Sequence, residues 1–184
     1  MPARRTLLLA ALAAACPIHS TARTSPRPPA ELRADMPGAR LQGQGRLRFL
    51  GMLVYDIRLW TQAPLRADNA LLVESALEIE YARRIKGHLL AERSLSEMQR
   101  VGDFTAIDGE RWLAAMKTLF PDDVLAGDRI TGVHRPGEGA RFHINGRLLG
   151  EVRDANFARV FFAIWLSPQT SEPQLRAALL GSAS

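Results

Sequence analysis

Cysteine is almost absent from this sequence, in which Cys16 is the only one among 184 residues. A single thiol cannot close an intramolecular disulfide, and it cannot supply the paired thiolates of a zinc site. We therefore expect a single domain that folds without disulfides. Hydrophobic residues make up 47% of the chain, which is enough for an apolar core to provide the stability.

Histidine is also scarce, and none of the four residues stands four positions from another, as on a metal-binding helix. His134 and His143 could face each other across a hairpin. Two imidazoles without a third ligand make a poor metal site, however. We expect neither a metal nor a cofactor.

Signals of nucleophilic or phosphate chemistry are weak. There is no Gly-x-Ser-x-Gly motif, which argues against a serine hydrolase. Gly43-Gln44-Gly45 precedes a strand, whereas the dinucleotide fingerprint follows one. Several serines stand where helices are expected to begin or end: Ser94, Ser96, Ser167 and Ser171. Three carboxylates lie in loops, where they usually accept turn hydrogen bonds: Asp122, Asp123 and Asp128.

Positive charge is present but not concentrated in the domain. The formal net charge is +5, but Arg4 and Arg5 fall in an apolar leader, and Arg23 and Arg27 fall in a Pro-rich tail. From Glu31 onward acidic and basic side chains nearly balance, and no basic stripe with interleaved aromatic residues occurs. We expect no nucleic-acid partner.

The N-terminus has the pattern of a removable signal peptide. Arg4-Arg5 precedes an apolar run that is too short to span a bilayer. Cleavage is expected after Ala22; the alternatives are cleavage before Cys16, which would leave a lipidated cysteine, and a leader that stays attached as a frayed helix. The adjacent arginines also fit a twin-arginine signal. We predict a signal peptide at 1–22, a flexible Pro-rich linker at 23–30 and a periplasmic or secreted domain at 31–184, with no transmembrane segment in the mature chain.

Three segments have strand patterns. Arg46–Trp60 is expected to form one long strand, because Tyr55 and its apolar neighbours of equal parity share a face, with Gly51 at a bulge or a close backbone approach. Leu71–Arg83 is expected to form a second strand, with Glu78 and Glu80 on its polar face. Ile130–Val152 predicts a β-meander with a type I′ turn at Asn145-Gly146.

Helices are expected between and after these strands. Ser94–Glu97 and Ser171–Gln174 have the spacing of capping boxes, with a further helix before the first of them from Gly87. Asp108 and Asp154 are expected to cap two more helices, and Gly181 to end the last one. Because strands and helices do not alternate, we predict an α+β fold with an antiparallel sheet.

The most informative residues are Tyr55, Tyr81 and Arg83, which lie on otherwise apolar strand faces. An arginine beside buried apolar surface is costly unless an anion or several acceptors meet it. Arg83 therefore either pairs with an Asp or Glu at a sheet edge, turns outward, or faces a ligand cavity. In the last case Arg83 and a tyrosine hydroxyl would hold a carboxylate or phenolate in an apolar pocket.

Several stretches, in order, give the domain from about Leu41 to Gly181 a resemblance to the bacterial, exported branch of the chalcone isomerase-like family. They are Leu53–Leu59, Tyr81–Ile85, Ser94–Met98, Trp112–Pro121, Gly127-Asp128, Phe142–Gly146, Phe157–Leu166, Pro173–Arg176 and Leu179–Gly181. The resemblance implies an open-faced β-sandwich, in which a large antiparallel sheet has helices packed on one side and a cleft between them.

The resemblance also bears on function. The plant enzyme of this fold closes a chalcone to a flavanone with the help of a strand threonine five residues before a tyrosine; that position is Leu50 here, which has no hydroxyl. Arg40 lies near the place of the enzyme's arginine, and Met98–Thr105 offers no match for its helix tyrosine and asparagine. Relatives without this activity bind fatty acids through an arginine and a tyrosine, a role that Arg83 with Tyr81 or Tyr55 would fill. We expect a non-catalytic protein that binds a small apolar anion such as a fatty acid; the alternatives are an intramolecular lyase or isomerase, and a cell-envelope interaction module.

Overall fold

The computed structural model describes residues 26–181. The predicted signal peptide and Cys16 lie outside the described residues and stay predictions. The elements are α1 (Ala30–Asp35), β1 (Arg40–Phe49), β2 (Met52–Thr61), β3 (Ser75–Tyr81), α2 (Gly87–Val101), α3 (Ala106–Leu119), β4 (Arg129–Arg135), β5 (Gly139–Ile144), β6 (Arg147–Val152), α4 (Ala155–Leu166) and α5 (Pro173–Leu180).

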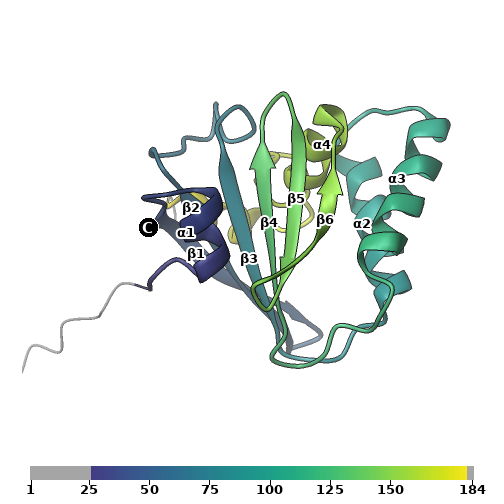
Figure 1. Ribbon diagram of the computed structural model, residues 1–184, viewed down its shortest axis with the longest axis horizontal. Coiled ribbons are helices and arrows are strands. Elements are labelled where there is room, and N and C mark those ends of the chain that lie inside the picture. The colour runs from purple at the N-terminus through teal and green to yellow at the C-terminus, as the bar shows by residue number, and fades with distance from the viewer. Residues whose placement is uncertain (1–25, 182–184) are drawn as a thin grey trace, which may run out of the picture.

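The strands form one six-stranded sheet in the order β1-β2-β3-β4-β5-β6, and every neighbouring pair is antiparallel. Figure 1 shows this curved sheet with α4 behind it and α2 and α3 beyond the β6 edge. Because each strand follows its neighbour in sequence, short turns or helical connections on one side suffice to join them. The predicted α+β fold with a large antiparallel sheet is confirmed.

The segment predicted as one long strand is instead a hairpin. Leu50 and Gly51 form a two-residue turn between β1 and β2, with φ angles of +48° and +78°. Leu47 then pairs with Tyr55 on the neighbouring strand, so the two residues share a face as their parity indicated. The prediction failed because a leucine at the first left-handed position gives no turn signal.

The predicted meander is confirmed as β4, β5 and β6. Its second turn has Asn145 and Gly146 at φ angles of +50° and +84°, as a type I′ hairpin requires. The second predicted strand begins later than expected, at Ser75, and its Glu78 is buried on the face away from the main core. There Glu78 accepts hydrogen bonds from Trp60 Nε1 at 2.7 Å and from Arg58 at 3.0 Å.

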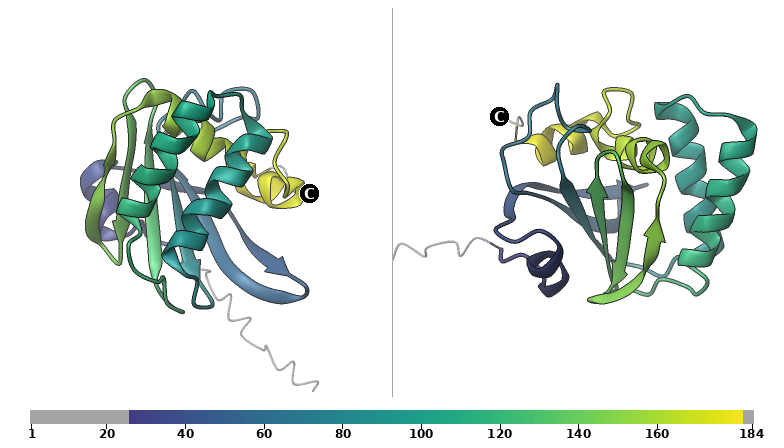
Figure 2. Two further views of the ribbon diagram at one scale, coloured as in Figure 1. Left: turned by 90° about the vertical axis from the view of Figure 1, so that its right-hand side faces the viewer. Right: turned by 45° about the horizontal axis from the view of Figure 1, so that its top comes forward.

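Helices α4 and α5 pack on the concave face of the sheet, where the main core lies, and α2 packs on α4. Figure 2 shows α4 and α5 close against the sheet, with α2 and α3 forming an outer pair. Helix α4 is almost wholly buried, and its Phe157 and Phe161 make edge-to-face contacts with Phe142 of β5, while Phe162 packs against Phe161. Asp154 caps this helix, as predicted, by accepting from the backbone N–H groups of residues 156 and 157.

Three of the predicted helix starts are wrong. Ser94 and Glu97 lie in the middle of α2, which runs unbroken from Gly87, and both are buried. Helix α5 begins after Glu172 without a side-chain cap, so Ser171 does not form the predicted box. Helix α3 is capped by Thr105, whose hydroxyl accepts from the N–H of Asp108, so Asp108 is the third residue of the helix and not its cap. Gly181 ends α5 in the left-handed conformation, as predicted.

A short helix, α1, covers the opposite face of the sheet and lies in front of it in Figure 1. Leu32 and Met36 pack there on Trp60, Ala76 and Val133. The acidic residues of α1 are held by cations of the sheet: Glu31 by Arg129 at 3.0 Å, and Asp35 by Arg141. The helix therefore fixes the back of the sheet and leaves the other face to form the site.

Candidate ligand cavity

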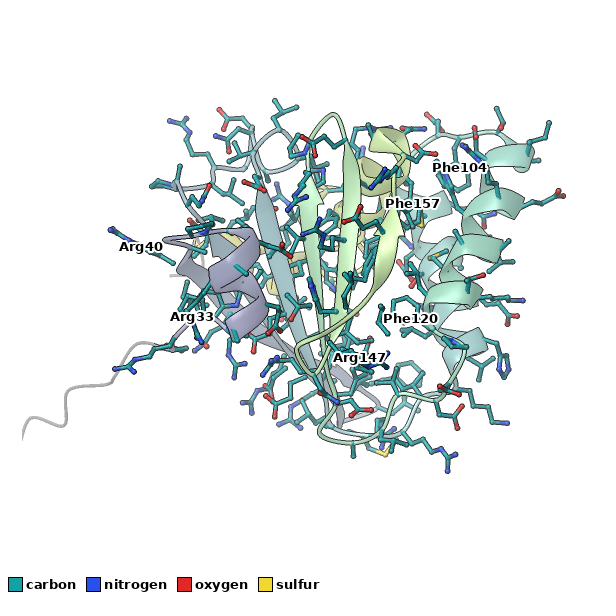
Figure 3. All side chains as sticks on the ribbon, viewed as in Figure 1. Arg33, Arg40, Phe104, Phe120, Arg147 and Phe157 are labelled. Atoms are coloured by element: carbon teal, nitrogen blue, oxygen red, sulfur yellow. The ribbon has the colours of Figure 1, made fainter. Side chains whose placement is uncertain are left out.

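A cavity of about 460 Å³ lies between the concave face of the sheet and helices α2 and α4. Its volume falls in the usual range for small-molecule sites. The floor comes from β1 to β5, and one wall comes from α2. The residues that line it are mostly apolar: Leu47, Phe49, Val54, Leu77, Ile79, Ile85, Leu89, Leu90, Phe120, Ile130, Phe142, Phe161, Phe162, Ile164 and Trp165. In Figure 3 the labelled Phe120 lies between the sheet and the outer helices, at one edge of this space.

The structure brings all three residues singled out from the sequence to this cavity. Tyr55 and Tyr81 face each other across β2 and β3, with ring centroids 5.8 Å apart in an edge-to-face arrangement. Arg83 follows two residues after Tyr81 and keeps the same parity, so it continues the cavity wall where β3 ends. The three side chains thus form a polar strip on the sheet side of the cavity, which is otherwise apolar apart from Arg48.

Arg83 has no carboxylate partner among residues 26–181. Its Nη2 donates to Met52 Sδ at 3.4 Å, and its Nε is buried without a hydrogen-bond partner. The structure thus excludes, among these residues, the alternative that Arg83 pairs with an Asp or Glu at a sheet edge. A buried guanidinium nitrogen without an acceptor is costly, and a bound anion would remove that cost.

The two tyrosine hydroxyls differ in their partners. The Tyr55 hydroxyl accepts a hydrogen bond from Trp165 Nε1 at 2.9 Å, whereas the Tyr81 hydroxyl makes none among the described residues. Burial raises the pKa of Tyr55 to about 12, with smaller contributions from Glu172 and Glu97, and burial raises the pKa of Tyr81 further. Both hydroxyls therefore stay protonated at neutral pH and can donate a hydrogen bond to an acceptor in the cavity.

This difference in hydrogen bonding predicts that the same substitution, tyrosine to phenylalanine, lowers the stability of the protein at one position and not at the other. Tyr55→Phe leaves Trp165 Nε1 without its acceptor, so we expect it to lower the free energy of unfolding by about 1 kcal/mol. Tyr81→Phe removes a hydroxyl that makes no such bond, and we expect a change within about 0.5 kcal/mol. Urea unfolding of both variants measures this, and equal losses would contradict the assignment.

Charged residues at the cavity wall were missed from the sequence. Glu97 and Ser94 were interpreted as a helix start, but they face the cavity from the middle of α2. Glu97 is neutralised by Arg93 at 2.5 Å and Arg100 at 3.3 Å. Trp165 and Glu172 also line the cavity. The position of Glu97 between Leu90 and Met98 on one helix face was the available signal, since a carboxylate there interrupts a buried stripe.

The other candidates lie outside the cavity. Arg40 begins β1 and points away from the helices, as Figure 3 shows, and Leu50 is exposed in the β1–β2 turn. His134 and His143 are not paired across the hairpin: they lie opposite Ala140 and Thr131. In the described part of the chain no three His, Cys, Asp or Glu side chains could hold a metal ion.

Of the loop carboxylates, Asp128 accepts turn hydrogen bonds as expected. Asp128 accepts from the N–H of Leu125 at 2.7 Å and from the side-chain amide of Asn145 at 2.8 Å. Asp123 pairs with Arg84 at 2.7 Å on the surface. Asp128 therefore stabilises a turn, whereas Asp123 forms an ion pair, and neither residue lines the cavity.

The fold and the cavity define a class of protein, namely α+β proteins in which an apolar cavity lies between an open antiparallel sheet and the helices that cover it. Residues 28–181 match the model of the chalcone isomerase-like family, and the chain belongs to this family. The family resemblance drawn from the sequence is thereby confirmed.

Two relatives place the chain further. It is 28% identical over 128 residues to an uncharacterised protein of Haemophilus influenzae, which covers 70% of this chain and 61% of the relative. The chain thus spans about three-fifths of that relative's length. The crystal structure of an Arabidopsis thaliana fatty-acid binding protein superimposes with a TM-score of 0.64 at 16% identity, covering 78% of this chain and 87% of the other. At this identity the likeness shows the fold. Within the described residues, no helix is both long and apolar enough to cross a membrane.

Proposed function

We propose that this protein binds an apolar carboxylate of the fatty-acid class in the cavity between the sheet and helices α2 and α4. Arg83 pairs with the carboxylate, a tyrosine hydroxyl donates a second hydrogen bond, and the chain of the ligand lies along the phenylalanines of α4 and β5. The observation that carries this proposal is the buried Arg83 Nε, which has no acceptor among the described residues.

The composition of the wall favours an acid with a long apolar part. A few placed polar groups in an apolar cavity fix the orientation of a ligand, while the apolar surface supplies most of the affinity. Each methylene moved from water into such a cavity contributes about 0.8 kcal/mol. The fold shared with a plant fatty-acid binding protein agrees with this ligand class.

Binding fits the cavity better than proton-transfer chemistry. No histidine among residues 26–181 lines it, and the raised pKa values of Tyr55 and Tyr81 make both hydroxyls poor bases near neutral pH. Leu50, at the position where the plant enzyme has its threonine, is at the exposed turn. We therefore prefer a binding protein to an intramolecular lyase.

Titration with a matched acid and alcohol tests the proposal. We expect decanoate to bind about tenfold or more tightly than decanol, because only the carboxylate pairs with the guanidinium. Isothermal titration calorimetry of residues 26–184 measures both affinities. Equal affinities would contradict a role for Arg83 in ligand binding, and turnover of an added chalcone, followed by absorbance, would contradict a binding-only function.

A further inference from the structure

The tip of the β1–β2 hairpin is the most unusual surface of the described chain. Phe49, Leu50 and Met52 are 64%, 82% and 48% exposed, and Leu89 of α2 is 48% exposed. Phe49 and Leu89 also line the cavity, whereas Leu50 and Met52 lie next to Phe49 at the turn and outside the lining. These four residues are here called the apolar rim. Figure 2 (left) shows the hairpin curving away from the other strands so that its tip projects from the molecule.

Leu50 is unfavourable here on two counts. It has a φ angle of +48°, a left-handed conformation that is costly for a residue with a branched side chain, and it is exposed to water. The β5–β6 turn has nearly the same backbone angles but carries Asn145, the usual residue for this position. The fold therefore does not require a leucine at the β1–β2 turn, and such an exception at a surface site suggests a function.

The charge around the apolar rim indicates its partner. Arg48 and Arg83 line the same cavity, and neither forms an ion pair within residues 26–181. Exposed apolar side chains next to unpaired cations are typical of surfaces that sit in the headgroup region of an anionic bilayer. A protein partner would need a larger and flatter apolar face than these four side chains offer.

We infer that the apolar rim docks this protein on the surface of an anionic lipid bilayer, with the cavity mouth turned toward the lipid. Leu50 and its neighbours insert among the acyl chains, while Arg48 lies at the level of the phosphates. The inference rests on the proposed function, because docking is useful only if the cavity binds an apolar acid. With its mouth against the bilayer, the cavity can exchange such an acid with the lipid without the acid crossing water.

Flotation with lipid vesicles tests this inference. Residues 26–184 are expected to float with vesicles of equal parts phosphatidylglycerol and phosphatidylcholine, but not with phosphatidylcholine alone, and to be released by high salt. Leu50→Asn is expected to weaken vesicle binding about tenfold. Because asparagine suits the turn, the melting temperature should stay equal or rise.

A matched variant separates docking from general stickiness. Leu72 is 71% exposed in the connection between β2 and β3, at the other end of β2 from the turn, and Leu72→Asn should leave flotation unchanged. Both variants should bind decanoate in solution as the wild type does, since neither residue lines the cavity. If the wild type does not bind decanoate in solution but still floats with anionic vesicles, the proposed function is contradicted and the docking inference is not.

Three outcomes would overturn the docking inference. The wild type would fail to float with anionic vesicles, Leu50→Asn would float as well as the wild type, or light scattering would show a dimer that Leu50→Asn dissociates. The last result would assign the apolar rim to a second copy of this chain.

Discussion

Replacing Arg83 with glutamine is expected to weaken the binding of decanoate by about tenfold to a hundredfold, the value of a hydrogen-bonded charge pair. Glutamine keeps a polar side chain, with its amide at the place of Nε, but lacks the outer part of the guanidinium and its positive charge. The apolar wall of the cavity remains, so the affinity for decanol should hardly change. Calorimetric titration of the variant with both ligands measures the two effects.

The same variant separates a binding role from a structural one. In the ligand-free protein Arg83 has a buried nitrogen without a partner, so its removal should leave the melting temperature equal or raise it. Arg84→Gln is the matched control, because Arg84 is the next residue and pairs with Asp123 on the surface, outside the cavity. Equal loss of decanoate affinity in both variants would contradict the assignment, and so would a lower melting temperature of Arg83→Gln with an unchanged affinity for decanoate.

The second large effect concerns stability at acidic pH. His134 is buried against Phe162, with ring centroids 4.8 Å apart, and its Nδ1 has no hydrogen-bond partner. Burial lowers the pKa of His134 from 6.5 to about 4. Between these values the unfolded chain binds a proton that the folded chain does not, so the free energy of unfolding falls as the pH falls.

We expect His134 to account for a loss of about 3 kcal/mol between pH 7 and pH 4. His134→Phe keeps a flat ring against Phe162 and removes the titrating group, so its stability should depend less on pH. Urea unfolding across this pH range measures the difference, with His88→Gln on the exposed surface of α2 as control. If the curves of wild type and His134→Phe run parallel, the burial of a neutral His134 is contradicted.

Sequence patterns predicted most of the sheet because its inward residues alternate and its later turns use ordinary residues. Asn145-Gly146 is one such turn, and the cap at Asp154 is another local signal that the structure confirms. The first hairpin could not be predicted in this way. Leu50 keeps the sequence apolar through the turn, and Leu53 and Tyr55 continue the parity of Leu47, which makes two strands look like one.

Sequence patterns were least reliable for polar residues that line the cavity. Ser94 and Glu97 have the spacing of a helix start, yet they face the cavity from mid-helix. Arg83, Tyr55 and Tyr81 could be singled out because each is a polar group on an apolar strand face. Trp165 could not, since its indole lies in a helix that is apolar all round, and only the fold brings it to Tyr55.

Native mass spectrometry of freshly purified protein tests the central claim most directly. The account predicts an additional mass equal to one fatty acid on the wild-type domain and on Arg84→Gln, and its absence from Arg83→Gln. A clean ligand-free mass for the wild type, with no rise in melting temperature when decanoate is added, would contradict it.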